Sequence, residues 1–194
     1  MNLQSDSAQK IYLDIISRSS SRINDLINDR LFISHEPESI PEQYSIYRLI
    51  EDALVTINDR IVLKNITVRK VYSTQDCRAM VNKQKINIAL CNLMVSAIER
   101  MEKDKGALTL VTKSIKGKCV IEIQDNGYGF RKKSLRDGIK SYFTHKWEGF
   151  NLGLSAALDI LRSSHIKVDL QSEEGKGTSF ILSFLGSQYS EKLF

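Results

Sequence analysis

The sequence predicts an α+β fold preceded by a long N-terminal helix. Two observations lead to this prediction. From residue 44 onward, short alternating runs rich in β-branched residues take turns with longer segments of helical periodicity. Before them, one long amphipathic segment is set apart by the 2 prolines of the chain, Pro37 and Pro41. A chain of 194 residues is long enough for one ordinary domain and an appendage.

The composition is that of a soluble globular protein, with 42% hydrophobic and 26% charged residues. No apolar run approaches the roughly 20 residues that a membrane-spanning helix needs. Residues 1–7 carry neither the basic nor the apolar part of a signal peptide. We therefore expect a cytoplasmic protein with no membrane segment, whose three cysteines, Cys77, Cys91 and Cys119, are reduced thiols without metal spacing.

The net charge of +5 suits a nucleic-acid binder, but the basic residues are spread along the chain. Their densest cluster, Arg131–Lys133 with Arg136, directly follows a glycine-rich turn, where it can attract phosphates. No basic stripe is interleaved with aromatic residues, so nucleic acid is not an expected partner.

Residues 8–33 have the periodicity of one amphipathic helix. Leu13, Ile16, Ile23 and Ile27 lie on a single apolar stripe. A lone helix cannot bury such a stripe, so it must pack against another helix, from this chain or from a second copy.

The elements that follow are expected from their local patterns. Residues 44–103 predict a short strand at 44–47, a helix at 49–63 that Asn65 can end, a strand at 66–72 and a helix at 82–103. Residues 107–185 predict strands at 107–113 and 118–124 joined around Gly117, a helix at 152–163, a strand at 166–171, a turn at 173–178 and a strand at 179–185.

The functional prediction depends on the motif Asp-Asn-Gly-Tyr-Gly-Phe at residues 125–130, which follows a strand. A carboxylate at the end of a buried strand needs hydrogen-bond donors, and Asp125 can accept from the amine of a flat ligand. Gly127 and Gly129 allow a sharp turn and a close approach of the backbone to that ligand. The alternative is an ordinary turn at the end of a strand.

A second motif is the glycine-bearing loop at residues 147–154, which runs into the helix predicted at 152–163. Free N–H groups and the positive end of the helix dipole make such a helix start a site for phosphate. An amine-binding pocket followed by an anion site predicts a nucleotide ligand. The Walker P-loop pattern does not occur in the sequence.

In this order and spacing, the two motifs resemble those of the ATP-binding domain of sensor histidine kinases, members of the GHKL ATPase superfamily related to gyrase and the mismatch-repair ATPases. An asparagine box at 92–99 and a lid box at 142–146 extend the resemblance. It implies a two-layer α/β sandwich, with a mixed sheet and helices on one face, for residues 44–194. Residues 1–36 resemble the second helix of the dimerisation hairpin, which implies a homodimer, and residues 37–43 are the linker.

The resemblance also implies roles for individual residues. Asp125 would bind adenine, and Gly127 and Gly129 would shape the pocket. Asn92 and Ser96, which share one face of a helix, would be the catalytic pair that holds Mg²⁺. The other residues expected to bind ATP lie in the lid and the glycine loop: Phe143, Thr144, Lys146, Gly149, Gly153 and Leu154.

Two positions depart from the family pattern. Ser96 stands where the family has a second asparagine, and Asn151 stands where it has the middle glycine of the loop. A serine hydroxyl is shorter and less polar than an amide carbonyl, so we expect weakened Mg²⁺ binding and impaired activity. Asparagine tolerates a positive φ better than most residues, so the turn can persist.

The chain is expected to contain no phosphoacceptor histidine. His35 is followed by prolines, which exclude a regular helix there, His145 belongs to the lid, and His165 lies between a helix and a strand.

The resulting hypothesis is a histidine kinase catalytic portion. It would transfer the γ-phosphoryl group of ATP to a histidine outside this segment, on an acceptor helix of the same or another kinase chain, and so to a response regulator. One alternative is a degenerate, non-catalytic module used for dimerisation or regulation. Another is a protein-serine kinase of the anti-sigma type, against which the long N-terminal helix argues.

Overall fold

A computed structural model describes residues 40–115, 118–130 and 152–185. All of them belong to a unit that starts at Ile40, and the preceding unit, Met1–Ser39, lies outside the described residues. The helix expected at residues 8–33 and the lid expected at residues 131–149 therefore stay predictions.

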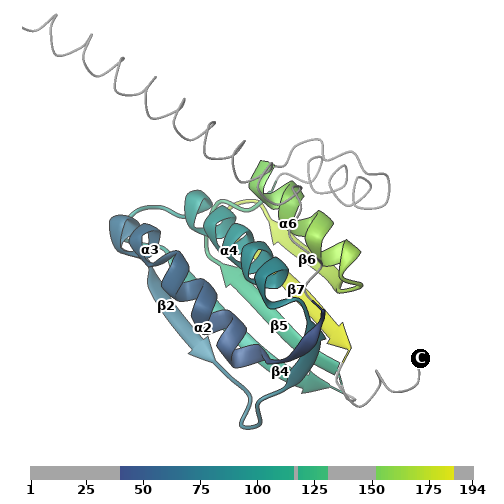
Figure 1. Cartoon of the computed structure of the whole chain (residues 1–194). Helices are drawn as coiled ribbons and strands as arrows, with labels where there is room; N and C mark the ends of the chain where they lie inside the picture. Colours follow the sequence, from purple (N-terminus) through teal and green to yellow (C-terminus); the bar gives the residue numbers. More distant parts are fainter. Residues whose placement is uncertain (1–39, 116–117, 131–151, 186–194) are drawn as a thin grey trace, which may run out of the picture. The chain divides into compact units, whose positions relative to one another are not determined.

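A mixed sheet of five strands forms one layer, in the order β2-β4-β5-β7-β6 (Figure 1). β2 runs parallel to β4, and the other neighbours are antiparallel. The register sets Leu110 opposite Ile123 and Ile123 opposite Phe180, so inward-facing apolar side chains form continuous rows. The strands are β2 (Thr67–Val71), β4 (Ala107–Ile115), β5 (Lys118–Asp125), β6 (Lys167–Glu173) and β7 (Gly177–Leu185).

Helices cover one face of this sheet, with α4 packed between α2 and α6 (Figure 1). The mixed sheet with helices on one face is thus confirmed. Fully buried side chains from both layers, among them Leu90, Leu93, Leu110 and Phe180, make the core between them. The helices are α2 (Ile46–Thr56), α3 (Asn58–Lys64), α4 (Lys83–Arg100) and α6 (Leu152–Ser163).

The single helix expected at residues 49–63 is instead two helices, and this prediction was wrong. The backbone breaks at Ile57, whose side chain is only 3% exposed. α2 buries a full apolar face, whereas α3 has no buried residue and leaves Val62 and Leu63 exposed. After the break, Ile61 of α3 packs against the core while partly exposed, and Asn65 then ends α3 in the left-handed conformation with φ 51°.

A second, two-stranded sheet was not anticipated. It pairs β1 (Glu42–Ser45) with β3 (Arg78–Val81) in antiparallel fashion. The strand expected at residues 44–47 ends at Ser45, because Ser45 Oγ accepts a hydrogen bond from the N–H of Arg48 (3.2 Å) and caps α2. β3 escaped notice because four residues are too few for an alternating pattern to stand out.

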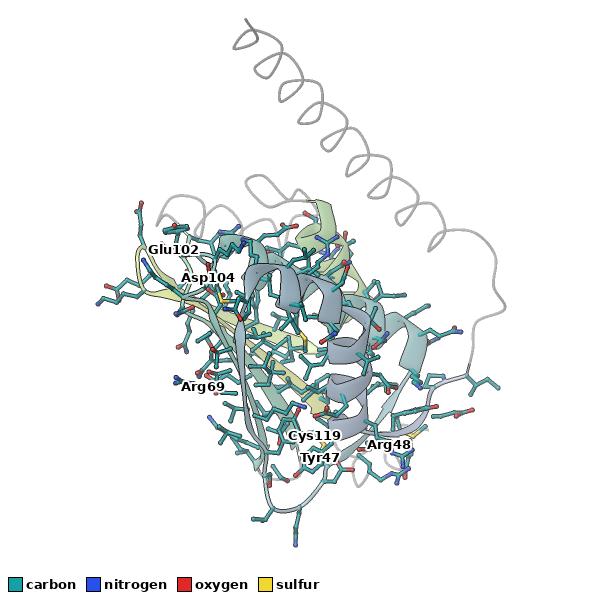
Figure 2. All side chains as sticks on the ribbon, turned by 90° about the vertical axis from the view of Figure 1, so that its left-hand side faces the viewer. Tyr47, Arg48, Arg69, Glu102, Asp104 and Cys119 are labelled. Carbon is teal, nitrogen blue, oxygen red and sulfur yellow. A yellow bond between two sulfur atoms is a disulfide. The ribbon has the colours of Figure 1, made fainter. Side chains whose placement is uncertain are left out.

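Cys77 and Cys119 form a disulfide, so the expectation of three reduced thiols is wrong for this pair. The two residues are 42 positions apart in the sequence, but their Cα atoms lie 5.7 Å apart, because Cys77 precedes β3 and Cys119 lies near the start of β5. Cys91 is a free thiol, and burial raises its pKa. Figure 2 shows Cys119 far from Glu102 and Asp104, which lie in the loop after α4.

Within the described residues, every helix is too short or too polar to cross a membrane.

Candidate functional site

Asp125 ends β5 with a buried carboxylate that is only half satisfied. The side chain is 8% exposed, and its Oδ1 accepts a hydrogen bond from the N–H of Gly127 (2.8 Å). Its Oδ2 is also buried and has no partner in the protein. Burial raises the pKa of Asp125, while the N–H groups of Gly127 and Thr178 and the charge of Arg100 oppose that rise. A buried oxygen without a donor is costly, so this atom is suited to a ligand.

The two glycines after Asp125 are explained by contacts within the protein. A Cβ added to Gly127 would lie 2.7 Å from the carbonyl oxygen of Arg100, at the end of α4. Gly129 has φ +66°, and its Cβ would lie 2.3 Å from the carbonyl oxygen of Glu173. Only glycine lets the loop of residues 125–130 pass between α4 and the β6–β7 turn.

Further hydrogen bonds hold this loop at both ends. Asn126 accepts from the N–H of Ala107 (2.8 Å) and donates to the carbonyl of Lys105 (2.9 Å). The N–H of Phe130 donates to Ser172 Oγ (2.8 Å). These hydrogen bonds fix the conformation of the loop against its neighbours. The fixed loop in turn fixes the orientation of Asp125.

Asn92 and Ser96 occupy one face of α4, as their spacing predicts. Ser96 is 2% exposed, and its Oγ has no hydrogen-bond partner. A Cβ added to Gly153 would lie 3.6 Å from Asn92 Oδ1, so the first turn of α6 lies beside the amide of Asn92. The site thus combines a second unsatisfied buried oxygen with an amide that faces a helix start.

The first turn of α6 can present its backbone, but not the side chain of Leu154. That side chain is 0% exposed and packs in the core. What this first turn can offer a ligand is therefore backbone and the positive end of the α6 dipole. α6 packs along α4, which brings this positive end to the face that carries Asn92 and Ser96.

Two residues near Asp125 were missed by the sequence analysis. Thr178 is 4% exposed and stands opposite Asp125 in the sheet register. Arg100 is half-buried, donates to the carbonyl of Gly129 (3.2 Å), and has its Cζ 3.4 Å from the ring centre of Phe130. A signal for Arg100 exists in the sequence, because it lies one helical turn beyond Ser96 on the same face of α4.

Comparison with known proteins decides the family. The model of the histidine kinase-, DNA gyrase B- and HSP90-like ATPase family matches residues 82–187, which is more than half of the chain. The chain belongs to this ATPase family. The matched segment runs from the cap of α4 past the end of β7, so it contains every site residue described above.

Curated relatives of this chain include sporulation kinases. Sporulation kinase C of Bacillus subtilis is 27% identical over 174 residues, which is 89% of this chain and 40% of the relative. Sporulation kinase A of the same organism is 23% identical over 174 residues, covering 89% of this chain and 28% of the relative. The chain thus spans less than half the length of these relatives.

Solved structures share the fold. Histidine kinase ThkA in complex with the response regulator protein TrrA has a TM-score of 0.72 and 23% identity, over 94% of this chain and 52% of that one. The catalytic domain of ThkA alone has a TM-score of 0.63 and 22% identity, over 76% of this chain and 96% of that one. The ATPase fold here is therefore that of a histidine kinase catalytic domain.

The expected site residues of this chain fall into two groups. The described ones are Asn92 and Ser96 in the second half of α4, Asp125 at the end of β5 with Gly127 and Gly129 after it, and Gly153 and Leu154 in the first turn of α6. Phe143, Thr144, Lys146 and Gly149, with Asn151, lie outside the described residues. Among the described residues, no group of three His, Cys, Asp or Glu side chains is placed to hold a metal ion.

Proposed function

We propose that this chain is the ATP-binding catalytic portion of a two-component sensor histidine kinase. It transfers the γ-phosphoryl group of ATP to a histidine outside residues 1–194, and from there the group passes to a response regulator. The observation that carries the proposal is the buried, unpartnered Oδ2 of Asp125, at the start of a loop that packs on the end of α4, the helix that carries Asn92 and Ser96.

The adenine end of the site is assigned to Asp125. Its Oδ1 is occupied by the N–H of Gly127, so Oδ2 is the atom left to accept a hydrogen bond from the exocyclic amine of adenine. A hydrogen bond to a charged acceptor contributes about 1.5–3 kcal/mol, enough to select a base that carries an amine at that position.

The phosphate end is assigned to the start of α6. The positive end of the α6 dipole, at the turn that holds Gly153 and Leu154, would stabilise the negative charge of the phosphates there. The lid residues Thr144 and Lys146, with Phe143 as the packing residue and Gly149 in the glycine loop, would complete this end. These four assignments rest on the resemblance alone.

Mg²⁺ fits the residues present, though weakly. Asn92 and Ser96 would hold it, and the unpartnered Oγ of Ser96 is an oxygen available for that purpose. The ion would neutralise charge between the β- and γ-phosphates. A hydroxyl is a poorer ligand than an amide carbonyl, so the affinity for the ion is reduced.

The partners of the proposed reaction lie outside the described residues. They are an acceptor helix of the same or another kinase chain, a response regulator, and a second copy of this chain that pairs through residues 1–36. We assign residues 37–43 as linker and residues 44–194 as the ATP-binding domain, acting in the cytoplasm. Size determination of the full chain and of residues 44–194 tests the pairing: only the full chain should be a dimer.

A second candidate, a non-catalytic regulatory module, is favoured by one observation. Ser96 presents a single neutral hydroxyl, buried at 2% exposure, at the position assigned to the metal. If Mg²⁺ is held too weakly for phosphoryl transfer, the nucleotide would act as a ligand that sets the conformation of the domain.

Calorimetric titration with ATP tests nucleotide binding, with and without Mg²⁺. We expect binding in both conditions, a modest gain from Mg²⁺, and a larger gain in the variant Ser96→Asn. Absence of ATP binding to the intact chain would refute the proposal.

Transfer of label from γ-labelled ATP to a separately added kinase acceptor helix separates the two candidates. Labelled acceptor supports the kinase. ATP binding without any labelled acceptor, in both the natural chain and Ser96→Asn, would support the regulatory module.

A further inference from the structure

Arg100 contacts the loop of residues 125–130 in three ways. Its carbonyl oxygen accepts a hydrogen bond from the N–H of Tyr128 (3.2 Å). Its Nη1 donates to the carbonyl of Gly129 (3.2 Å), and its guanidinium stacks on Phe130. Main chain and side chain of one residue thus hold three consecutive loop residues against the end of α4.

The guanidinium also acts on Asp125 at a distance. Burial lowers the pKa of Arg100, and the charges of Asp125 and Glu99 oppose that fall. Reciprocally, the charge of Arg100 lowers the pKa of Asp125. Desolvating a half-buried cation is costly, so packing alone does not explain why an arginine occupies this position near a buried carboxylate.

We propose that Arg100 is a positioning residue of the nucleotide site, which fixes the loop of residues 125–130 and places a positive charge near Asp125 so that its free Oδ2 meets the base as a carboxylate. This inference rests on the proposed nucleotide site and adds to it a residue that never touches the reacting atoms. A bound base excludes water from Asp125, and the nearby guanidinium then replaces part of the lost solvation.

Other charged groups near this loop are already engaged. From the β6–β7 turn, Glu173 pairs with Lys176 (2.6 Å). From the loop after α4, Lys105 pairs with Glu102 (2.8 Å). The strands beside Asp125 offer Leu108 and Thr178, which carry no charge. Within the described part of the chain, Arg100 is therefore the charge to test.

The experiment compares the natural chain with Arg100→Met, Arg100→Lys and Arg60→Met. Arg60→Met is the matched control, because Arg60 is an exposed arginine that pairs with Glu99 on α4 (3.6 Å) but makes no loop contact. Adenosine is the probe, titrated by NMR between about pH 4 and 8, because it has no phosphate groups that titrate in this range.

For the natural chain we expect adenosine affinity to fall as the pH drops through the pKa of Asp125. In Arg100→Met the affinity at neutral pH should be about tenfold lower, which corresponds to the loss of one charge-assisted contact. The midpoint of the pH profile should move to higher pH, because the neighbouring positive charge is gone. Arg100→Lys should keep the natural midpoint with intermediate affinity, and Arg60→Met should match the natural chain.

An unmoved midpoint in Arg100→Met overturns the proposal, whether or not the affinity falls, because a purely structural residue would lower affinity without changing the titration. If Arg100→Met does not fold, Arg100→Gln, which keeps a hydrogen-bond donor without the charge, decides: a midpoint shifted to higher pH supports the proposal, and the natural midpoint overturns it. Failure of the natural chain to bind both adenosine and ATP is a different result, which refutes the proposed function itself.

Discussion

Asp125 shows how a single residue can be costly to the fold and useful to a ligand. Its carboxylate is buried, one oxygen has no partner, and burial raises its pKa. The glycines after it favour the folded state instead, because any side chain at Gly127 or Gly129 would collide with protein backbone. At the scale of the residue, stability and binding are therefore separable by substitution.

Replacing Asp125 by Asn should lower ATP affinity by at least about tenfold, because a charged acceptor is lost. The same change should leave the free energy of unfolding equal or higher at about pH 7. The pKa of Asp125 is raised in the folded state, so its carboxyl ionises in the unfolded chain at a lower pH than in the folded one. The free energy of unfolding therefore falls as the pH rises through this range. Any gain from the substitution should disappear in acid, below the unfolded pKa. Urea unfolding at both pH values, with ATP titration at neutral pH, measures both effects; a large loss of stability at neutral pH would contradict this account.

Two glycine-to-alanine changes should have opposite effects. Gly129→Ala forces a side chain into φ +66° and against the carbonyl of Glu173, so it should destabilise the fold by about 2 kcal/mol or more. Gly153→Ala puts a methyl group of α6 3.6 Å from Asn92 Oδ1 of α4, an ordinary van der Waals distance. It should raise stability by about 0.5–1 kcal/mol and lower ATP affinity by crowding the amide of Asn92. Equal effects on stability would show that the two glycines share one role.

The elements meet at the C-terminal end of α4, and this junction shapes the site. The Nζ of Lys64, at the end of α3, donates to the carbonyls of Ile98, Glu99 and Met101, each at 3.0 Å. Ile98 and Glu99 lie in the last turn of α4 and Met101 is its C-cap, whose N–H also donates to the carbonyl of Ile98 (3.2 Å). The lysine charge complements the negative end of the helix dipole there. α3 therefore holds the end of the helix from which Arg100 contacts the loop of residues 125–130.

Lys64→Met should lower the free energy of unfolding by about 1–2 kcal/mol, because three carbonyls lose a charged donor. It should also weaken ATP binding, since the end of α4 and the loop of residues 125–130 would be held less firmly. Chemical unfolding and ATP titration measure the two effects. The control is Lys103→Met, an exposed lysine in the loop after α4, which should match the natural chain. A natural stability for Lys64→Met would show that α4 needs no support from α3.

Across the whole molecule, the disulfide and the candidate site lie at opposite ends of β5. Cys119 is the second residue of β5 and Asp125 is its last. The disulfide joins the core of the five-stranded sheet to the segment that leads into β3, and the carbonyl of Cys77 accepts the N–H of Ile46 at the start of α2. The small β1–β3 sheet is thus tied to the main one at the end of β5 that lies away from Asp125.

Reduction should lower stability without abolishing ATP binding. Closing a loop of 42 residues contributes up to about 4 kcal/mol by restricting the unfolded chain. We expect a lower melting temperature in a reductant for the natural chain, and no effect of reductant on Cys77→Ser. Thermal unfolding with ATP titration, each with and without reductant, checks this. Loss of ATP binding on reduction would mean that the two ends of β5 are coupled.

The sequence by itself determined what depends on neighbouring residues. The bounds of α6, the strands around Asp125, the helix end at Asn65 and the shared face of Asn92 and Ser96 follow from periodicity and residue chemistry over a few positions. Residue patterns of this length also carried the resemblance that led to the family. Local rules succeed there because the deciding contacts lie within one or two helical turns.

Only the tertiary structure decided the rest. Three of these features join segments that are far apart in the sequence: the pairing of β1 with β3, the Cys77–Cys119 disulfide and the hydrogen bond from Arg100 to Gly129. The fourth, the break at Ile57, depends on packing against a core built from distant residues. A pattern of a few residues cannot encode which distant backbone will lie within hydrogen-bond reach. That distance is set by how helices and sheet pack, and packing depends on all of their side chains together.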